Sequence, residues 1–181
     1  MAYPQPLSIV VYGDPILQRR AKDLPAVTPE QERLAQAMFD LMYASHGVGL
    51  AAPQVSISER LIVLDARCVM PHATPKALVN PEILERTGRH TAVEGCLSLP
   101  GIEGEVTRAE TIRVRAIQLG AGPVEFTTEG FEARIIQHEV DHLNGILFID
   151  RLPWLKRRLL KRTLRHHLVQ SRPPAAQPAL L

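Results

Sequence analysis

The sequence contains few cysteines and few aromatic residues, and both shortages narrow the class of protein. Only two cysteines, Cys68 and Cys96, occur among 181 residues, which is too few for a framework of disulfide bonds. Aromatic residues make up 4% of the chain, so aliphatic side chains must form most of the core. With 45% hydrophobic residues, the chain is long enough for one compact domain.

Long apolar segments are also missing. No apolar run approaches the roughly 18 residues that a transmembrane helix needs. The first residues lack the charged start and apolar run of a signal peptide. We therefore expect a cytoplasmic protein with no membrane association. In addition, we expect a monomer.

Charge is unevenly distributed along the chain. The net charge is +2, but residues 1–152 carry 14 Lys and Arg against 19 Asp and Glu, a balance of −5. Residues 153–181 carry 7 basic residues and no acid. This pattern predicts an acidic body, residues 1–152, with an appended basic segment, residues 153–181, which we expect to be a helix followed by a Pro- and Ala-rich disordered tail.

Hydrophobic spacing predicts three helices, over about residues 29–44, 130–143 and 153–169. Thr28 and Pro29 are typical of a helix start, and Asn144-Gly145 of a helix end. Short β segments are predicted at 61–64, 77–83, 84–93, 102–107, 111–118 and 123–128. Because the strands cluster between two helices, we expect an α+β fold. Its short antiparallel or mixed sheets would surround a central helix, with an N-terminal and a C-terminal helix outside.

The segment His138-Glu139-Val140-Asp141-His142 is the sharpest local signal. Residues four apart lie on one face of a helix, so both imidazoles can reach one ion. Glu139 lies about 100° round the helix, where it can reach a metal-bound water without being a ligand. A surface helix with polar side chains would explain the pattern without a metal, but the apolar flanks on both sides indicate a buried helix.

A catalytic metal site needs a third protein ligand, and the downstream sequence does not offer one. Phe148 stands where a third histidine would follow in the common zinc-protease pattern, and Asp150 is the last acid in the chain. The third ligand must therefore come from upstream. Cys96 is the best candidate, because a thiolate binds zinc or ferrous iron strongly and Gly95 permits close approach.

Three segments together resemble the signature motifs of the peptide deformylase family, in the order and at the spacings of that family. They are Gly47-Val48-Gly49-Leu50-Ala51-Ala52-Pro53-Gln54, Glu94-Gly95-Cys96-Leu97-Ser98 and His138-Glu139-Val140-Asp141-His142. Weaker similarities, among them Gly13-Asp14-Pro15-Ile16-Leu17, extend the match over about residues 7–152. The resemblance implies a catalytic domain of these residues that removes the formyl group from the N-terminal formylmethionine of newly synthesised proteins.

The resemblance also implies roles for individual residues. Cys96, His138 and His142 would hold one divalent ion, Fe²⁺ in the cell, with Zn²⁺, Ni²⁺ or Co²⁺ able to replace it in preparations. Glu139 would act as general acid and base. The oxyanion would be held by the metal, the side-chain amide of Gln54 and the backbone N–H of Leu97.

The same resemblance places the peptide substrate beside the glycine-rich segment. Gly47, Val48 and Gly49 would bind it as an added strand. The apolar pocket for methionine would be lined from the second helix by Phe131, Arg134 and Ile135. Glu94 is expected among the substrate-binding residues, and the resemblance implies that it pairs with Arg108.

Two residues differ from many relatives. Glu103 stands where a basic residue is common, and Arg134 where an apolar residue is common in bacterial members. We hypothesise that Glu103 and Arg134 pair across the mouth of the pocket.

The basic segment 153–181 combines an apolar stripe of leucines with lysines and arginines. A helix that packs on the acidic body through its leucines and exposes its basic face to solvent would explain this composition. The alternative is attraction to RNA phosphates, and the resemblance implies docking beside the ribosomal exit tunnel, as in some bacterial deformylases.

Two other functions remain open at this point. A general zinc endopeptidase would share the two histidines and Glu139, but it would need a third ligand that the chain lacks downstream. A purely structural metal site, with the basic segment as an RNA-binding module, would normally have four protein ligands, and only three can be named.

Overall fold

The computed structural model describes residue 3 and residues 6–170. The disordered tail expected from residue 171 lies outside these residues. Three helices are present: α1 (Pro29–Ala44), α2 (Gly130–Leu143) and α3 (Trp154–Gln170). Short 3-10 helices η1 (Pro15–Gln18), η2 (Ala52–Val55) and η3 (Phe148–Arg151) connect other elements. None of the helices described here has the length and apolar character required to cross a bilayer.

The strands form two separate antiparallel sheets. The larger sheet has the order β1-β2-β3-β6-β7, built from β1 (Gly49–Ala51), β2 (Leu61–Leu64), β3 (Lys76–Thr87), β6 (Thr111–Gln118) and β7 (Gly122–Glu129). The smaller sheet is the hairpin of β4 (His90–Gly95) and β5 (Glu103–Arg108). The predicted three helices and antiparallel pairing are confirmed.

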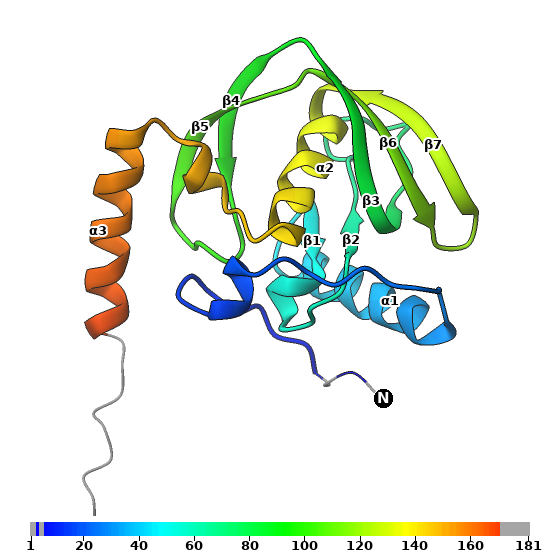
Figure 1. The fold of residues 1–181 in the computed structure, drawn as a ribbon, viewed down its shortest axis with the longest axis horizontal. Coiled ribbons are helices and arrows are strands. Elements are labelled where there is room, and N and C mark those ends of the chain that lie inside the picture. Colours follow the sequence, from blue (N-terminus) through cyan, green and yellow to red (C-terminus); the bar gives the residue numbers. More distant parts are fainter. Residues whose placement is uncertain (1–2, 4–5, 171–181) are drawn as a thin grey trace, which may run out of the picture.

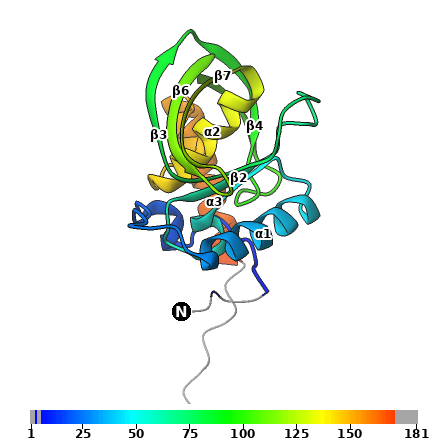
Figure 2. The same cartoon turned by 90° about the vertical axis from the view of Figure 1, so that its right-hand side faces the viewer.

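Helix α2 lies between the two sheets, with the curved strands of the larger sheet on one side and the β4–β5 hairpin on the other (Figures 1 and 2). Its apolar side chains, including Ile136, Val140 and Leu143, pack on the inner face of the larger sheet. The opposite face of β1 and β2 is covered by α1 through Leu34, Met38 and Met42. The helix that carries both histidines is therefore buried along most of its length.

The ends of α1 and α2 follow the local sequence. Thr28 and Gln31 form a capping box at the start of α1, with Pro29 at the first helical position. Helix α2 ends at Asn144 and Gly145. The N–H of Gly145 donates to the carbonyl of His142, and the N–H of Ile146 donates to that of Asp141. The left-handed conformation of Gly145, with φ 72°, makes this ending possible.

One strand boundary was predicted wrongly. The sequence predicted separate strands at 77–83 and 84–93, but β3 continues through Asn80 and Pro81 to Thr87, and β4 begins only at His90. Proline has no N–H for the ladder, and the pairing with β6 shifts register between Val79 and Glu82. Asn80 takes a left-handed conformation, and its side chain exchanges two hydrogen bonds with the backbone of Leu24, which holds the irregular segment in place.

We predict that Gly145→Ala destabilises the protein more than Gly120→Ala. Both glycines have positive φ, 72° and 80°, so both substitutions strain the backbone by about 1 kcal/mol. A Cβ at Gly145 would also lie 2.7 Å from the backbone of Gln18, whereas nothing lies within 4 Å at Gly120. Denaturant unfolding should show an additional loss of about 1–3 kcal/mol for Gly145→Ala. Equal losses would contradict the close approach of α2 to η1.

Candidate active site

Helix α2 presents two histidines and a glutamate to the space between the sheets. His138 and His142 lie one turn apart, with ring centroids separated by 5.0 Å. His142 is 1% exposed, and its Nδ1 has no hydrogen-bond partner among the described residues. Burial holds the pKa of this ring well below its usual value. A buried, neutral imidazole is the form that binds a metal ion.

Cys96 completes a group of three side chains that could hold a metal ion. It directly follows β4, and its Sγ lies 3.2 Å from Nε2 of His142. The ligand atoms of Cys96, His138 and His142 all lie within 4.8 Å of one another. One thiolate and two imidazoles form a donor set for zinc or ferrous iron. The residues present therefore fit a single divalent ion with further coordination positions open.

Glu94 orients the imidazole ring of His138 through a contact with its Nδ1. Nδ1 of His138 lies 3.0 Å from Oε2 of Glu94, which leaves Nε2 for a metal ion. Burial opposes ionisation of Glu94, but hydrogen bonds with His138 and Arg108 outweigh it and lower the pKa of this carboxyl to about 2. Burial also disfavours the imidazolium form of His138, yet hydrogen bonds to Cys96 and Glu94 raise its pKa to about 10.

Glu94 belongs to a larger buried charge cluster that joins the hairpin to α2. Nε and Nη2 of Arg108 donate to the two oxygens of Glu94 at 2.6 and 2.9 Å, as expected from the sequence. Nη1 of Arg108 donates to Asp141 at 2.8 Å, and Asp141 also accepts from Arg151. This cluster fixes the angle between β4, β5 and α2.

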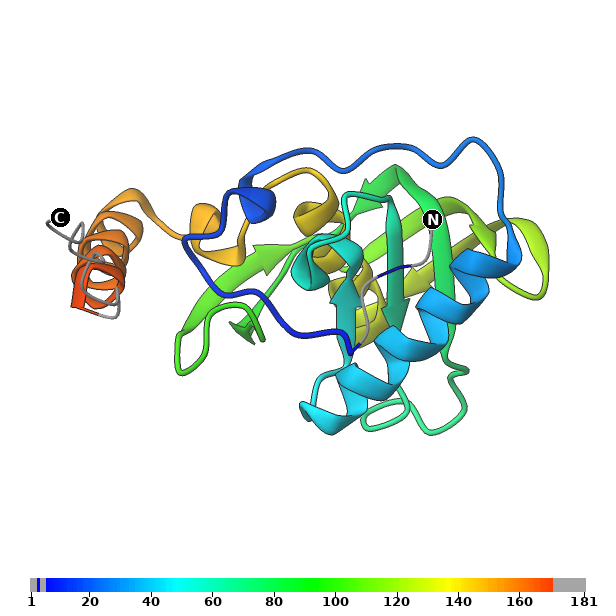
Figure 3. The same cartoon turned by 90° about the horizontal axis from the view of Figure 1, so that it is seen from below.

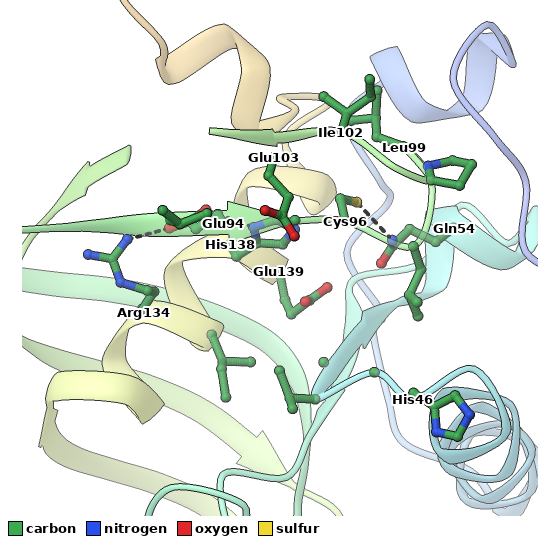
Figure 4. Close-up of a pocket in the computed structure, with 18 of the residues that line it drawn as sticks. His46, Gln54, Glu94, Cys96, Leu99, Ile102, Glu103, Arg134, His138 and Glu139 are labelled. Atoms are coloured by element: carbon green, nitrogen blue, oxygen red, sulfur yellow. Dashed lines mark hydrogen bonds and ion pairs between the residues drawn. The ribbon is translucent and has the colours of Figure 1, made fainter. Parts of the chain in front are cut away.

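The hypothesis that Arg134 pairs with Glu103 is wrong. Arg134 is buried, and its Nη1 donates to Oε1 of Glu94 at 2.6 Å and to the carbonyl of Val106 at 3.0 Å. Its Nη2 donates to the carbonyl of His90 at 2.7 Å. Figure 4 shows the guanidinium turned toward the hairpin and away from the carboxylate of Glu103. All the acceptors of Arg134 lie on the hairpin strands, whose packing on α2 the sequence spacing does not reveal.

Glu139 has the environment of a general base. It is 4% exposed, and its Oε2 has no hydrogen-bond partner among the described residues. Burial raises the pKa of this carboxyl to about 7, although the nearby His138 acts against the shift. A Cβ at Gly49 would collide with Oε1 of Glu139 and with Cγ2 of Ile135, so a larger residue there would displace the carboxylate from its present position.

Gln54 and Leu97 offer hydrogen-bond donors beside Cys96. Oε1 of Gln54 accepts from the N–H of Ala51 at 2.8 Å, which turns its amide nitrogen toward Ser98 Oγ at 3.2 Å and Cys96 Sγ at 3.5 Å (Figure 4). Among the described residues, the backbone N–H of Leu97 donates to no acceptor. Ser98, which helps to hold Gln54, was not singled out from the sequence.

A pocket of about 440 Å³ opens beside these groups. All the residues expected to bind substrate line it: Gly47, Val48, Gly49, Glu94, Phe131, Arg134 and Ile135. His46, which belongs to none of the sequence motifs, lines it too, as do Glu103 and the segment Leu99–Ile102. The latter residues lack a distinctive pattern and reach the pocket only because the connection between β4 and β5 folds over it.

Comparisons with known proteins agree with this geometry. The sequence model of the family described as polypeptide deformylase matches residues 6–158. A peptide deformylase of Desulforudis audaxviator is 46% identical over 151 residues, which cover 83% of this chain and 96% of the relative. The crystal structure of peptide deformylase from Thermus thermophilus superposes with a TM-score of 0.81 at 42% identity, covering 90% of this chain and 95% of that structure. A peptide deformylase of Alkalilimnicola ehrlichii is 44% identical over 92% of this chain and 93% of its own length.

We predict that Glu94→Gln weakens metal binding by about 10- to 100-fold, because the carboxylate orients His138. The substitution also leaves Arg108 and Arg134 without their buried anion, which costs about 3–5 kcal/mol of the free energy of unfolding. Competition with a chelator and denaturant unfolding measure the two effects. Glu110→Gln, which removes an exposed carboxylate 3.7 Å from His90, is the matched control. If the two variants behaved alike, the orienting role of Glu94 would be rejected.

Proposed function

The chain belongs to the polypeptide deformylase family, whose members deformylate nascent peptides, and we propose that it hydrolyses the formyl amide of N-terminal formylmethionine with Glu139 as general acid and base. The observation that carries this proposal is the buried, unpartnered carboxylate oxygen of Glu139 next to three metal-binding side chains. A buried carboxylate of raised pKa can both accept and return a proton near neutral pH.

Cys96, His138 and His142 would hold one divalent ion, which we propose is Fe²⁺ in the cell, with Zn²⁺, Ni²⁺ or Co²⁺ able to occupy the same donors in preparations. When bound, such an ion lowers the pKa of water and polarises the formyl carbonyl. Glu139 takes the proton from the attacking water and gives it to the leaving amine. A carboxylate that is not itself a ligand is free to make both transfers.

The negative charge that develops on the carbonyl oxygen calls for fixed donors. The amide nitrogen of Gln54 and the N–H of Leu97 flank Cys96 and would supply them. Because Ala51 and Ser98 already hold the side chain of Gln54, the amide needs little reorganisation when the charge forms. Preorganised donors of this kind stabilise the transition state more than the substrate.

The peptide would lie along Gly47, Val48 and Gly49, with its methionine side chain against Phe131 and Ile135. Both glycines lie in close contact with neighbouring side chains: a Cβ at Gly47 would be 2.8 Å from Cδ1 of Leu97, and one at Gly49 would be 2.7 Å from Cγ2 of Ile135. An extended peptide bound to exposed backbone groups in this way is recognised mainly by its main chain. That mode suits an enzyme that processes many nascent proteins.

We predict that Glu139→Gln lowers kcat for a formyl-Met-Ala-Ser peptide by about 10²- to 10⁴-fold while the metal content of the protein stays unchanged. The amide keeps the size of the side chain but cannot take a proton. Formate release by the metal-loaded protein, prepared without oxygen, measures the rate.

Acetyl-Met-Ala-Ser and unformylated Met-Ala-Ser serve as control substrates for the wild-type protein. Turnover of the formylated peptide alone supports deformylation. Cleavage of internal peptide bonds in casein would instead indicate an endopeptidase, and full activity of Glu139→Gln would refute the role of Glu139.

We also propose that α3 docks on ribosomal RNA. The helix stands away from the body of the protein (Figures 1 and 3). Leu160 packs on the body, but Trp154, Leu155 and Leu159 are 66%, 54% and 59% exposed. Exposed arginines lie among them, including Arg158 and Arg162. A face that is basic, partly apolar and exposed suits a polyanionic partner.

The double variant Arg158→Gln/Arg162→Gln is predicted to bind ribosomes more weakly at low salt. The slope of the logarithm of its affinity against the logarithm of the salt concentration should become less steep by about two units. Sedimentation with purified ribosomes at several salt concentrations measures both quantities. Arg86→Gln/Arg89→Gln removes the same charge from exposed arginines at the β3–β4 turn. An equal loss in this control would show that net charge, and not α3, determines binding.

A further inference from the structure

Glu103 is held at the pocket by its place in the β4–β5 hairpin. It begins β5 and pairs directly with Gly95, the residue before the metal-binding Cys96. Because Gly95 has no side chain, the stem of Glu103 can lie over it: a Cβ at Gly95 would be only 3.8 Å from Cγ of Glu103. Glu103 lines the same pocket as His138 and Glu139, and Figure 4 shows its carboxylate projecting toward that pocket.

Glu103 has no ion-pair partner in the pocket. Besides His46 and the candidate metal ligands Cys96 and His138, the other ionisable lining residues are Glu94, Arg134 and Glu139. Glu94 and Arg134 neutralise each other in a buried salt bridge of 2.6 Å, and Glu139 is itself an acid. Glu103 is exposed and has no hydrogen-bond or salt-bridge partner among the described residues. The rim of the pocket therefore carries an unpaired negative charge that a ligand can meet.

We propose that Glu103 is a specificity-determining residue, which favours formylated peptides carrying lysine or arginine at the second or third position. This inference rests on the proposed function, since it concerns the peptide that enters the same pocket. In this binding mode the methionine side chain of the substrate occupies the apolar part of the pocket near Phe131 and Ile135. The substrate residues that follow the methionine would then pass the rim of the pocket. A basic side chain there would approach the Glu103 carboxylate, and an acidic one would be repelled.

The expected effect is modest because the carboxylate is exposed to water. Ion pairs of this kind are weak and screened by salt. We expect kcat/KM for a lysine peptide to exceed that for the matching glutamate peptide by about threefold to tenfold at low salt. The difference should appear mainly in KM, because the contact is the same in the ground state and in the transition state.

The test uses the full-length, metal-loaded protein and five peptides: formyl-Met-Lys-Ala, formyl-Met-Glu-Ala, formyl-Met-Ala-Lys, formyl-Met-Ala-Glu and the neutral formyl-Met-Ala-Ala. Three variants are compared with the wild type. Glu103→Gln removes the charge, and Glu103→Arg reverses it. Glu105→Gln is the matched control, because Glu105 is an exposed acid on the same strand that pairs with Lys156 at 3.7 Å and does not line the pocket.

The proposal predicts a lysine preference at one or both positions in the wild type and in Glu105→Gln. The preference should disappear in Glu103→Gln, invert in Glu103→Arg and fade in the wild type at high salt. A wild type that does not distinguish lysine from glutamate overturns the proposal, as does a preference that survives in Glu103→Arg. If formyl-Met-Ala-Ala is not deformylated either, the proposed function itself fails, and the two failures are thereby distinguished.

Discussion

The buried carboxylate of Glu94 is the contact on which the rest of the site depends. It lies on β4 and meets three cations or donors from two other elements: Arg108 of β5, and Arg134 and His138 of α2. Each of these charges would destabilise the protein if it were buried without a partner. As a paired cluster they hold the β4–β5 hairpin against α2. The same strand continues directly into Cys96. One ion-paired cluster thereby sets both the orientation of His138 and the position of the sulfur.

The inner wall of the site depends on a different constraint, which is the absence of side chains. Gly49 lets β1 come up to the carboxylate of Glu139, and Gly47 lets the side chain of Leu97 pack against the backbone. Glycine at these two positions therefore serves close approach rather than a turn. The result is a pocket with backbone on one side, the candidate metal ligands Cys96 and His138 in its lining, and Glu103 at its acidic rim.

Local patterns in the sequence were enough to predict the three helices, most strands and the candidate ligand residues. The spacing of His138 and His142 depends only on helix geometry, and the capping residues of α1 are adjacent in the chain. Pairing between elements was harder to predict. The partner of Arg134 depends on the angle between the hairpin and α2, and the path of β3 through Asn80-Pro81 depends on a contact with the distant Leu24. His46 carries no local signal, and the motif that contains Ser98 does not reveal its contact with the distant Gln54.

X-ray absorption spectroscopy at the edge of the bound metal tests the central claim most directly, because it counts the atoms around the ion without relying on activity. The donor set of Cys96, His138 and His142 predicts one sulfur scatterer at about 2.3 Å, two imidazole nitrogens at about 2.0–2.1 Å and lighter oxygen ligands. In Cys96→Ser the sulfur contribution should vanish. A wild-type spectrum without sulfur, or one unchanged by that substitution, would contradict the account.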